Sequence, residues 1–281
     1  MAAPEQEMVN VNLTGKVFLV TGASRGIGRE VAQILGANNA NLVLNATNRE
    51  LLGEVAQSID PSGERVLIVP GDITVRSIKE VKDPTTKELI HAAIPGPGEL
   101  MTQMGRERWG QIDAAIHVAG INRDGFFFRQ SDEDWDAVLA VKLDGARNLF
   151  LPAYGVMYRQ GYGRLVAVTS ISGEGNAFQG NYAAANMAVE GLMNTLSLEG
   201  TGLKKPEIEA QIVRLGAVES GMMLDLQAKK PEAVQAFVER MAIGRLITAR
   251  EAGNKIVEVA TGTNSDRNTH LHIFDGGFRR E

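Results

Sequence analysis

The stretch Thr21-Gly-Ala-Ser-Arg-Gly-Ile-Gly28 decides how this chain folds. It follows an apolar run, residues 16–20, which is typical of a buried strand, and it precedes residues 29–35, whose apolar side chains recur at helical spacing. The glycines therefore lie in a strand-to-helix turn, where they permit a tight bend and a close approach of an anion to the backbone. Free N–H groups at the start of the helix favour a phosphate there. In this context the stretch predicts a pyrophosphate site.

The composition is that of a soluble globular protein. The chain has 281 residues, of which 44% are apolar and 22% are charged. This length suits one large α/β domain or two small ones and is ample for a buried core. The net charge is −5 and the sequence contains no basic block, which argues against a nucleic-acid partner.

Several kinds of site are excluded or disfavoured by residue counts. The chain has no cysteine, which excludes disulfides, thiolate metal sites and a cysteine nucleophile. It has four histidines, and His270 and His272 lie in a strand-like alternation, so we expect no metal site. No apolar run has the length of a membrane span. The first seven residues lack the basic and apolar regions of a signal peptide, so we expect a cytoplasmic protein without membrane attachment.

Strand and helix patterns alternate along the whole chain. This alternation predicts an α/β fold, namely a single Rossmann-type doubly wound sheet of about seven parallel strands with helices on both faces. The strands are expected at residues 16–20, 41–44, 65–69, 113–118, 164–169, 209–214 and 269–274. Residues 1–12 are expected to form a flexible tail and residues 13–281 a single domain.

Two segments interrupt the alternation. Residues 76–108 are long for one crossover, and prolines at residues 94–98 must break any helix there. We expect an insertion that forms a surface excursion, with a lid or a subunit contact as the alternative. Residues 218–241 begin with an apolar cluster just after a strand end, where ligands bind in open α/β sheets. We expect a substrate flap, with plain helix packing as the alternative.

The motifs together resemble those of the short-chain dehydrogenase/reductase family. Thr21–Gly28, Val118-Ala-Gly120, Ser170 and Tyr182 carry the resemblance, which runs from about Leu13 to Phe278. The chain is most similar to the beta-ketoacyl-ACP reductase branch, through the motifs at residues 120–124, 135–138, 181–185, 244–246 and 275–277. These motifs are specific for fold and cofactor and much less specific for the substrate.

The resemblance implies transfer of a hydride between a nicotinamide and a carbonyl carbon. The carbonyl oxygen gains negative charge and needs a proton donor, which would be Tyr182, while Ser170 would hydrogen-bond the same oxygen. Ser170 ends the fifth expected strand and Tyr182 opens the next helix, so both can face one pocket. Ser172 is the less favoured serine.

The expected cofactor is NADP(H). NAD enzymes usually carry an acid at the end of the second strand, and this chain has Ala46-Thr47 there. Arg25 favours a 2′-phosphate through charge-assisted hydrogen bonds and Thr47 offers a hydroxyl; the alternative is that Arg25 only solvates the turn. The expected cofactor-binding residues are Gly22, Ser24, Arg25, Gly26, Ile27, Gly28, Thr47, Asp72, Ile73, Ala119, Gly120, Tyr182, Gly216 and Val218.

The chain departs from the family pattern beside the tyrosine. The family has a lysine four residues after Tyr182, on the same helix face, and this chain has Asn186. An ammonium about 4 Å from the phenol contributes roughly 4 kcal/mol at an effective dielectric constant near 20, or about three pKa units. The family's asparagine in the helix after the fourth strand is replaced by Lys142. We hypothesise that Lys142 supplies the missing charge; the alternative is that it points to solvent.

Two further positions differ from the family pattern. His117-Val118 stands where the family has Asn-Asn, and Arg214-Leu-Gly216 stands where it has a Pro-Gly turn. His117 is either a new titrating group near the cofactor or a residue that fills a strand end. We count Ser170, Tyr182, Lys142 and Asn186 as the candidate catalytic residues.

The expected substrate is an apolar or bulky carbonyl compound or an acyl thioester. Three consecutive aromatic residues, 126–128, cannot all face one core, and the candidate substrate-binding residues are Phe126, Phe127, Met222 and Met223. The family implies a homo-oligomer, a tetramer or a dimer, built through the helices of Lys142 and Tyr182. An NADP(H)-dependent carbonyl reductase is the first expectation. The alternatives are a non-redox enzyme on the same scaffold (a cyclase, isomerase or dehydratase) and a catalytically silent cofactor-binding protein.

Overall fold

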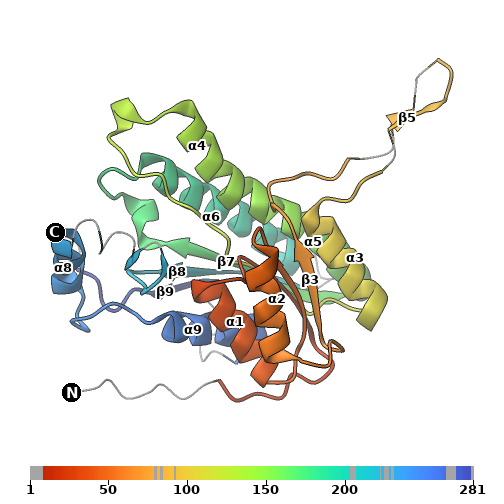
Figure 1. Cartoon of the computed structure of the whole chain (residues 1–281), viewed down its shortest axis with the longest axis horizontal. Coiled ribbons are helices and arrows are strands. Elements are labelled where there is room, and N and C mark those ends of the chain that lie inside the picture. The colour runs from red at the N-terminus through yellow and green to blue at the C-terminus, as the bar shows by residue number, and fades with distance from the viewer. Residues whose placement is uncertain are drawn as a thin grey trace.

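A computed structural model describes residues 9–78, 81–82, 85–91, 93–202, 207–221, 223–224, 228, 231–263 and 270–279. Within these residues, parallel strands form one seven-stranded sheet in the order β3-β2-β1-β6-β7-β8-β9 (Figure 1). The strands are β1 Val17–Thr21, β2 Asn41–Ala46, β3 Val66–Pro70, β6 Ala114–His117, β7 Tyr162–Ser170, β8 Glu207–Leu215 and β9 Leu271–Phe274. The predicted doubly wound sheet is confirmed.

Helices cover both faces of the sheet. The side chains of α1 (Gly26–Ala37), α2 (Arg49–Ile59) and α9 (Ala249–Thr261) belong to one apolar cluster. Those of α3 (Pro97–Trp109), α5 (Gly145–Gln160) and α6 (Gly180–Gly202) belong to a second cluster on the opposite face. The helices α4 (Asp132–Leu139) and α8 (Pro231–Arg240) lie at the ends of this layered body (Figure 1).

The central strand shows why the sequence folds in this way. All five residues of β1 are buried, and successive side chains point to opposite faces. Phe18 and Val20 enter the first cluster, while Val17 and Leu19 enter the second. A parallel strand that is buried on both faces reads as a continuous apolar run, as residues 16–20 do.

The chain order reverses at β1, which pairs with β2 on one side and with β6 on the other. Loops that leave the carboxyl ends of β1 and β6 therefore diverge to opposite faces and open a crevice between them. This switch point positions the candidate site.

The expected insertion is shorter in the structure than residues 76–108. An antiparallel ribbon of β4 (Val81–Lys82) and β5 (Leu89–His91) projects away from the body (Figure 1). At its base, the backbones of Ile78 and Ile94 exchange hydrogen bonds of 2.8 and 2.9 Å. Pro97 then starts α3, a position where a helix tolerates proline because no N–H partner is lost. Since α3 packs against α5, β2 and β3, it is the ordinary crossover helix and not part of the excursion.

The expected tail, residues 1–12, is also too long where the structure describes it. The backbone N–H of Val11 donates to Asn38 Oδ1 at 2.7 Å, and Asn38 Nδ2 donates to the Val9 carbonyl at 2.8 Å. Val9 and Val11 pack against the first apolar cluster. Residues 9–12 are therefore attached to the body, whereas residues 1–8 lie outside the described part.

Across the described ranges, no helix combines the length and the apolar character that a bilayer crossing requires.

Candidate functional site

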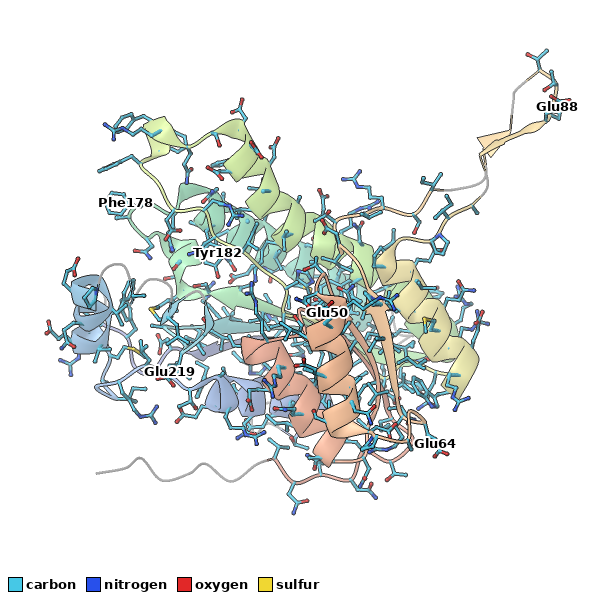
Figure 2. The ribbon with its side chains drawn as sticks, viewed as in Figure 1. Glu50, Glu64, Glu88, Phe178, Tyr182 and Glu219 are labelled. Carbon is cyan, nitrogen blue, oxygen red and sulfur yellow. The ribbon has the colours of Figure 1, made fainter. Side chains whose placement is uncertain are left out.

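The predicted cofactor residues gather at the carboxyl edge of the sheet. They follow β1, β2, β3, β6 and β8, and Tyr182 joins them from the first turn of α6. Tyr182 and Phe178 lie at the same end of the molecule as Glu219, away from Glu64 at the opposite edge (Figure 2). The residues of this set that the β-strand ends bring together are Gly22, Ser24, Arg25, Gly26, Ile27, Gly28, Thr47, Asp72, Ile73, Ala119, Gly120, Gly216 and Val218.

The turn after β1 forms a cradle for phosphate groups. Gly22 has a φ of +67°, and a Cβ there would lie 3.0 Å from the Ala119 backbone. A Cβ on Gly28 would lie 2.2 Å from the Gly22 carbonyl oxygen, so neither position accepts a side chain. The helix α1 starts without a side-chain cap and without an acid in its first turn, which leaves its N–H groups to an anion. These features fit the pyrophosphate of a dinucleotide.

The adenosine end of the expected site is open and carries no acid at the end of β2. Thr47 is exposed between β2 and the Asn48 cap of α2. Arg25 is exposed at the N-cap of α1. Asp72 is exposed and accepts a hydrogen bond from the Thr74 N–H at 2.9 Å, whereas Ile73 is buried in the second apolar cluster.

A residue that the sequence did not single out holds this end together. Asn45, one residue before Ala46, is buried on β2. Its Nδ2 donates to the carbonyls of Val69 and Gly71 at 2.8 and 3.0 Å. It thereby fixes the ends of β2 and β3 relative to one another. The signal that could have identified Asn45 is a polar residue that directly follows the apolar residues 42–44.

The loop after β8 lines the other end. A Cβ on Gly216 would lie 2.7 Å from the Asp275 Cα, so the close approach of these backbones requires glycine. Val218 is buried and pairs with Ile247 in an isolated parallel bridge. Met223 is half-buried and packs on the first apolar cluster. Met222 lies outside the described residues.

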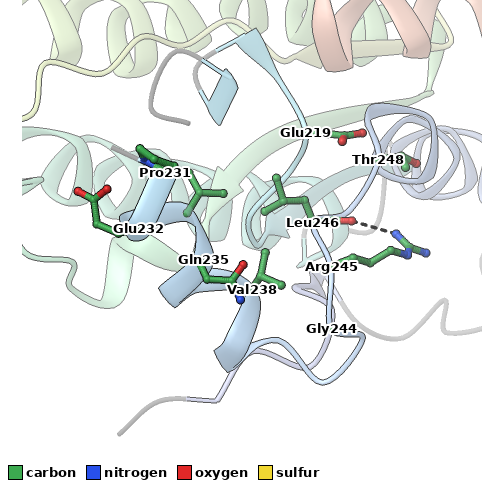
Figure 3. Close-up of a pocket in the computed structure, with 10 residues that line it drawn as sticks. Glu219, Pro231, Glu232, Gln235, Val238, Gly244, Arg245, Leu246 and Thr248 are labelled. Atoms are coloured by element: carbon green, nitrogen blue, oxygen red, sulfur yellow. Dashed lines mark hydrogen bonds between the residues drawn. The ribbon is translucent and has the colours of Figure 1, made fainter. Parts of the chain in front are cut away.

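A cavity of about 610 Å³ lies beside this loop, between α8 and residues 244–248 (Figure 3). Arg245 is anchored at its rim, since Nη1 donates to the Leu246 carbonyl at 2.9 Å and Nη2 bonds Glu251 at 2.7 Å. None of the residues that line the cavity is a predicted site residue. Six of the lining residues lie within the expected flap, residues 218–241, and the cavity does not include the Ser170–Tyr182 pair.

Ser170 and Tyr182 meet as predicted. Ser170 ends β7, and its Oγ accepts a hydrogen bond from the Ser172 N–H at 3.1 Å, which starts the short turn Ile171–Glu174. The polar side chains of Asn186 and Ser170 lie near the Tyr182 phenol. Burial raises the pKa of this phenol, the side chains of Asn186 and Ser170 oppose the rise, and the negative charge of Asp124 adds to it. The phenol is therefore protonated at neutral pH.

Lys142 points into the protein and not to solvent. It lies in a π-helical turn, Ala140–Asp144, and is 3% exposed. Its Nζ donates to the Val168 carbonyl at 2.7 Å, and a Cβ on Gly120 would lie 3.4 Å from that nitrogen. The ammonium thus lies beneath the turn after β6, and its hydrogen bond goes to β7 and not to the phenol. Burial lowers its pKa from 10.5 to about 8.

We expect Lys142→Met to stabilise the protein by up to ~3 kcal/mol at pH 7, because a pKa depressed from 10.5 to about 8 measures the cost of burying the charge. This free-energy cost of burying the Lys142 charge is present in full below pH 8, where the amine is charged in both the folded and the unfolded chain. It disappears as the pH rises through 10.5. Urea unfolding at pH 7 and pH 10.5 measures the difference. A variant that is less stable than the parent at pH 7 would contradict this account.

His117 fills the end of β6. It is fully buried, and its Nδ1 lies 3.0 Å from Thr21 Oγ1, which also accepts from the N–H groups of Val118 and Ala119 at 3.2 and 3.3 Å. Because Oγ1 already accepts twice, it donates to Nδ1. Burial and, second, the charge of Lys142 lower the His117 pKa to about 3. The ring is therefore neutral, which favours the strand-filling interpretation over a titrating group.

Buried polar atoms without a hydrogen-bond partner cluster near this edge. Among the described residues they are His117 Nε2, Asn186 Oδ1 and Gln130 Oε1. Asn186 uses its Nδ2 to donate to the Tyr182 carbonyl at 2.8 Å, so its oxygen remains a free acceptor. Unsatisfied buried groups are rare in native proteins and are frequent at binding sites. An acceptor at this position fits a ribose hydroxyl.

An exposed aromatic cluster adjoins the site. Phe126 is 52% exposed, and its ring meets that of Phe178 edge-on at 4.7 Å. Phe127 is 75% exposed and contacts Trp135 at 6.4 Å. Phe178, four residues before Tyr182, lies in the turn that precedes α6 and has a φ of +70°, a conformation that bulky residues rarely adopt. No motif in the sequence indicates this backbone conformation.

The comparisons with known proteins agree with this geometry. The family model described as short chain dehydrogenase matches residues 16–89 and 99–231. The chain is 33% identical over 241 residues to nodulation protein G of Rhizobium sp. (strain N33), which covers 85% of this chain and 88% of that protein. It is 28% identical over 252 residues to the 3-oxoacyl-[acyl-carrier-protein] reductase of Escherichia coli (strain K12), with 89% and 92% covered.

Two further similarities span nearly the whole chain. The short-chain reductase protein NovJ of Streptomyces niveus is 29% identical over 286 residues, 99% of both chains. The crystal structure of a short-chain dehydrogenase/reductase from Brucella melitensis, titled glucose/ribitol dehydrogenase, superposes with a TM-score of 0.80 at 24% identity, covering 97% of this chain and all of that one. The latter supports the fold alone. From the family model and these relatives together, the chain belongs to the short-chain dehydrogenase family, whose members are oxidoreductases that use a nicotinamide cofactor.

Proposed function

We propose that this protein is an NADP(H)-dependent reductase that converts a carbonyl group of an apolar or bulky substrate, or of an acyl thioester, into an alcohol. The observation that carries the proposal is the protonated Tyr182 phenol near Ser170, at the sheet edge that carries a glycine cradle that fits a dinucleotide. When bound, the reduced nicotinamide supplies the hydride. Relatives described as reductases support the reaction class.

Tyr182 and Ser170 act on the carbonyl oxygen. The Tyr182 phenol donates the proton that the oxygen needs as it gains negative charge, and the Ser170 hydroxyl donates a hydrogen bond to the same atom. Because the phenol pKa is raised, Tyr182 is protonated and available as the donor at neutral pH, although it is a weaker acid than an ordinary phenol, and it is a poor base. The arrangement therefore favours carbonyl reduction over alcohol oxidation.

Asn186 and Lys142 bind the cofactor in this proposal and do not activate the phenol. The free Asn186 Oδ1 accepts a hydrogen bond from a ribose hydroxyl, where a lysine would donate one. The buried Lys142 ammonium places positive charge beneath Gly120 and Ala119, a turn that faces the phosphate cradle. The Lys142 ammonium donates to the Val168 carbonyl, and an anionic cofactor compensates the remaining charge of this buried cation.

We infer a preference for NADP(H) because exposed Arg25 and Thr47 flank the end of β2 without a carboxylate. Arg25→Ala is expected to weaken NADPH binding about tenfold while changing NADH binding less than threefold, since a charge-assisted hydrogen bond contributes roughly 1.5–3 kcal/mol. Fluorescence titration with both cofactors measures this. Arg29→Ala, which removes an exposed charge one turn further along α1, is the control. Equal losses for both cofactors would contradict the assignment.

In this proposal the substrate side is formed by Phe126, Phe127 and Met223. The exposed Phe126–Phe178 pair offers an apolar rim next to Tyr182, which suits a bulky apolar group. Assembly into a tetramer or dimer would use α5 and α6, on which Leu151, Tyr158, Met187 and Leu198 are exposed. Light scattering of the purified protein tests the assembly.

NADPH oxidation with a panel of bulky ketones and 3-oxoacyl thioesters tests the function. The expected product carries two more hydrogens than the substrate, and one NADPH is consumed for each product molecule. Product formation without net NADPH consumption would instead support a cyclase, isomerase or dehydratase. NADPH binding without any product across the panel would support a silent cofactor-binding protein.

A further inference from the structure

Arg214 lies at the centre of a buried ionic network that connects the turn after Ser170 with the helix that carries Tyr182. It stands on β8, next to the last residue of the strand, and is 6% exposed. Its Nε donates to Glu190 Oε1 at 2.9 Å and its Nη2 bonds the other oxygen of the same carboxylate. Its Nη1 bonds Glu174. One guanidinium therefore holds two carboxylates from different elements.

Each carboxylate lies on the helix or turn that carries one of the predicted catalytic residues. Glu190 is buried on α6, two turns after Tyr182 and one turn after Asn186, on the same side of the helix. Glu174 is the last residue of the turn that Ser170 caps. Thr169, which directly precedes Ser170, donates its hydroxyl hydrogen to Glu190 Oε1 at 2.8 Å. The network thus holds both ends of the Ser170 segment and the helix of Tyr182.

A buried ion pair is weak evidence for a contribution to stability, because the desolvation of both charges offsets their attraction. A buried bidentate pair does define geometry, since the planar guanidinium accepts only one arrangement of the carboxylate. Arg214 begins the stretch Arg214-Leu-Gly216, which stands where the family has a Pro-Gly turn, so the network depends on a position at which this chain departs from the family pattern.

We infer that Arg214 is a positioning residue that sets the distance between the Ser170 hydroxyl and the Tyr182 phenol through Glu190, Thr169 and Glu174. This inference rests on the proposed reductase function. It assigns Arg214 no contact with substrate or cofactor. Its effect is therefore expected on turnover and not on cofactor binding.

The decisive variant is the double substitution Arg214→Met/Glu190→Met, which replaces the ion pair by apolar side chains of similar size and leaves no lone buried charge. We expect a folded protein with an unchanged NADPH dissociation constant and a kcat about ten- to a hundredfold lower, since a misplacement near 1 Å costs on that order. Hydrogen exchange of residues 170–182 should become faster, and that of α9 should not change.

Arg164→Met/Glu209→Met is the matched control. This pair joins the same two strands, β7 and β8, with Arg164 Nη2 at 2.6 Å from Glu209 Oε2, but it lies toward their other end. We expect kcat and the exchange of residues 170–182 to remain as in the parent. A similar loss in both double variants would overturn the inference, because the effect would then come from general destabilisation of the sheet.

Two single variants serve if the double variant does not fold. Thr169→Val and Glu174→Gln each remove one connection and leave the Arg214–Glu190 pair intact, and each should lower kcat about threefold or more without a change in NADPH affinity. Unchanged kcat and unchanged exchange would overturn the inference. If the parent itself reduces no carbonyl compound, the proposed function fails, and faster or unchanged exchange of residues 170–182 still decides the role of Arg214.

Discussion

Replacing Tyr182 by phenylalanine should lower kcat for carbonyl reduction by about 10²–10⁴-fold, the range that a positioned proton donor contributes. The substitution removes the phenol oxygen and leaves the ring in its half-buried place at the start of α6. The interactions of the phenol with Ser170 and Asn186 are lost, but the glycine cradle, Arg25 and Thr47 are untouched. NADPH affinity should therefore change less than threefold, and stopped-flow measurement of NADPH oxidation separates binding from turnover.

Two comparisons make this test specific. Ser172→Ala changes the less favoured serine and should reduce kcat far less than Ser170→Ala, because Ser170 is the hydroxyl that bonds the phenol. A Tyr182→Phe variant that keeps more than a tenth of the parent's kcat would show that another group donates the proton. The redox mechanism would then need a different acid.

The second large effect concerns Asn186→Lys, which restores a cation one helical turn from Tyr182. In the parent protein, burial and the charge of Asp124 raise the phenol pKa, so alcohol oxidation with NADP⁺ should increase with pH up to and above about 10. An ammonium about 4 Å from the phenol lowers that pKa by up to about three units. Oxidation near pH 8 should therefore increase roughly ten- to a hundredfold in the variant, while reduction at pH 7 changes little.

Asn186→Met is the uncharged control for this experiment. Methionine has a length similar to that of lysine, and it also removes the amide that lies near the phenol and donates to the Tyr182 carbonyl. It should leave the midpoint of the oxidation profile at or above that of the parent. A parent profile with a midpoint near neutral pH would contradict the proposal, because it would require a cation close to the phenol. The pH dependence of kcat for oxidation, measured for all three proteins, decides the matter.

The arrangement of the sheet could be predicted because each strand and each turn is encoded by residues that are close together in the sequence. Each strand end carries a turn signal, and the apolar run of β1 between Gly15 and the glycine-rich turn that follows the strand admits few alternatives. The meeting of Ser170 and Tyr182 was likewise predictable, since parallel strands bring their carboxyl ends to one edge. The ends of elements were less accurate: Pro97 was taken to break a helix and in fact begins one.

Long-range side-chain geometry could not be predicted in the same way. The sequence shows a lysine at position 142 but not the π-helical turn that directs its ammonium to the Val168 carbonyl. Both alternatives considered for Lys142, contact with the phenol and exposure to solvent, assumed an ordinary helix. Arg214 was noticed only as a departure from a turn motif, although a cation within the otherwise apolar residues 212–215 and an acid at position 190, among apolar residues of α6, indicate a buried pair.

The position of β1 has a consequence for synthesis of the chain. One edge of β1 pairs with β2 within a few tens of residues, but the other edge waits for β6, whose last residue, His117, pairs with Thr21. At ribosomal rates of about 5–20 residues per second, the open edge persists for roughly 5–20 s. An unpaired apolar strand edge is a template for association between nascent chains. Shortening the β4–β5 ribbon should therefore reduce the chaperone dependence of expression at high temperature.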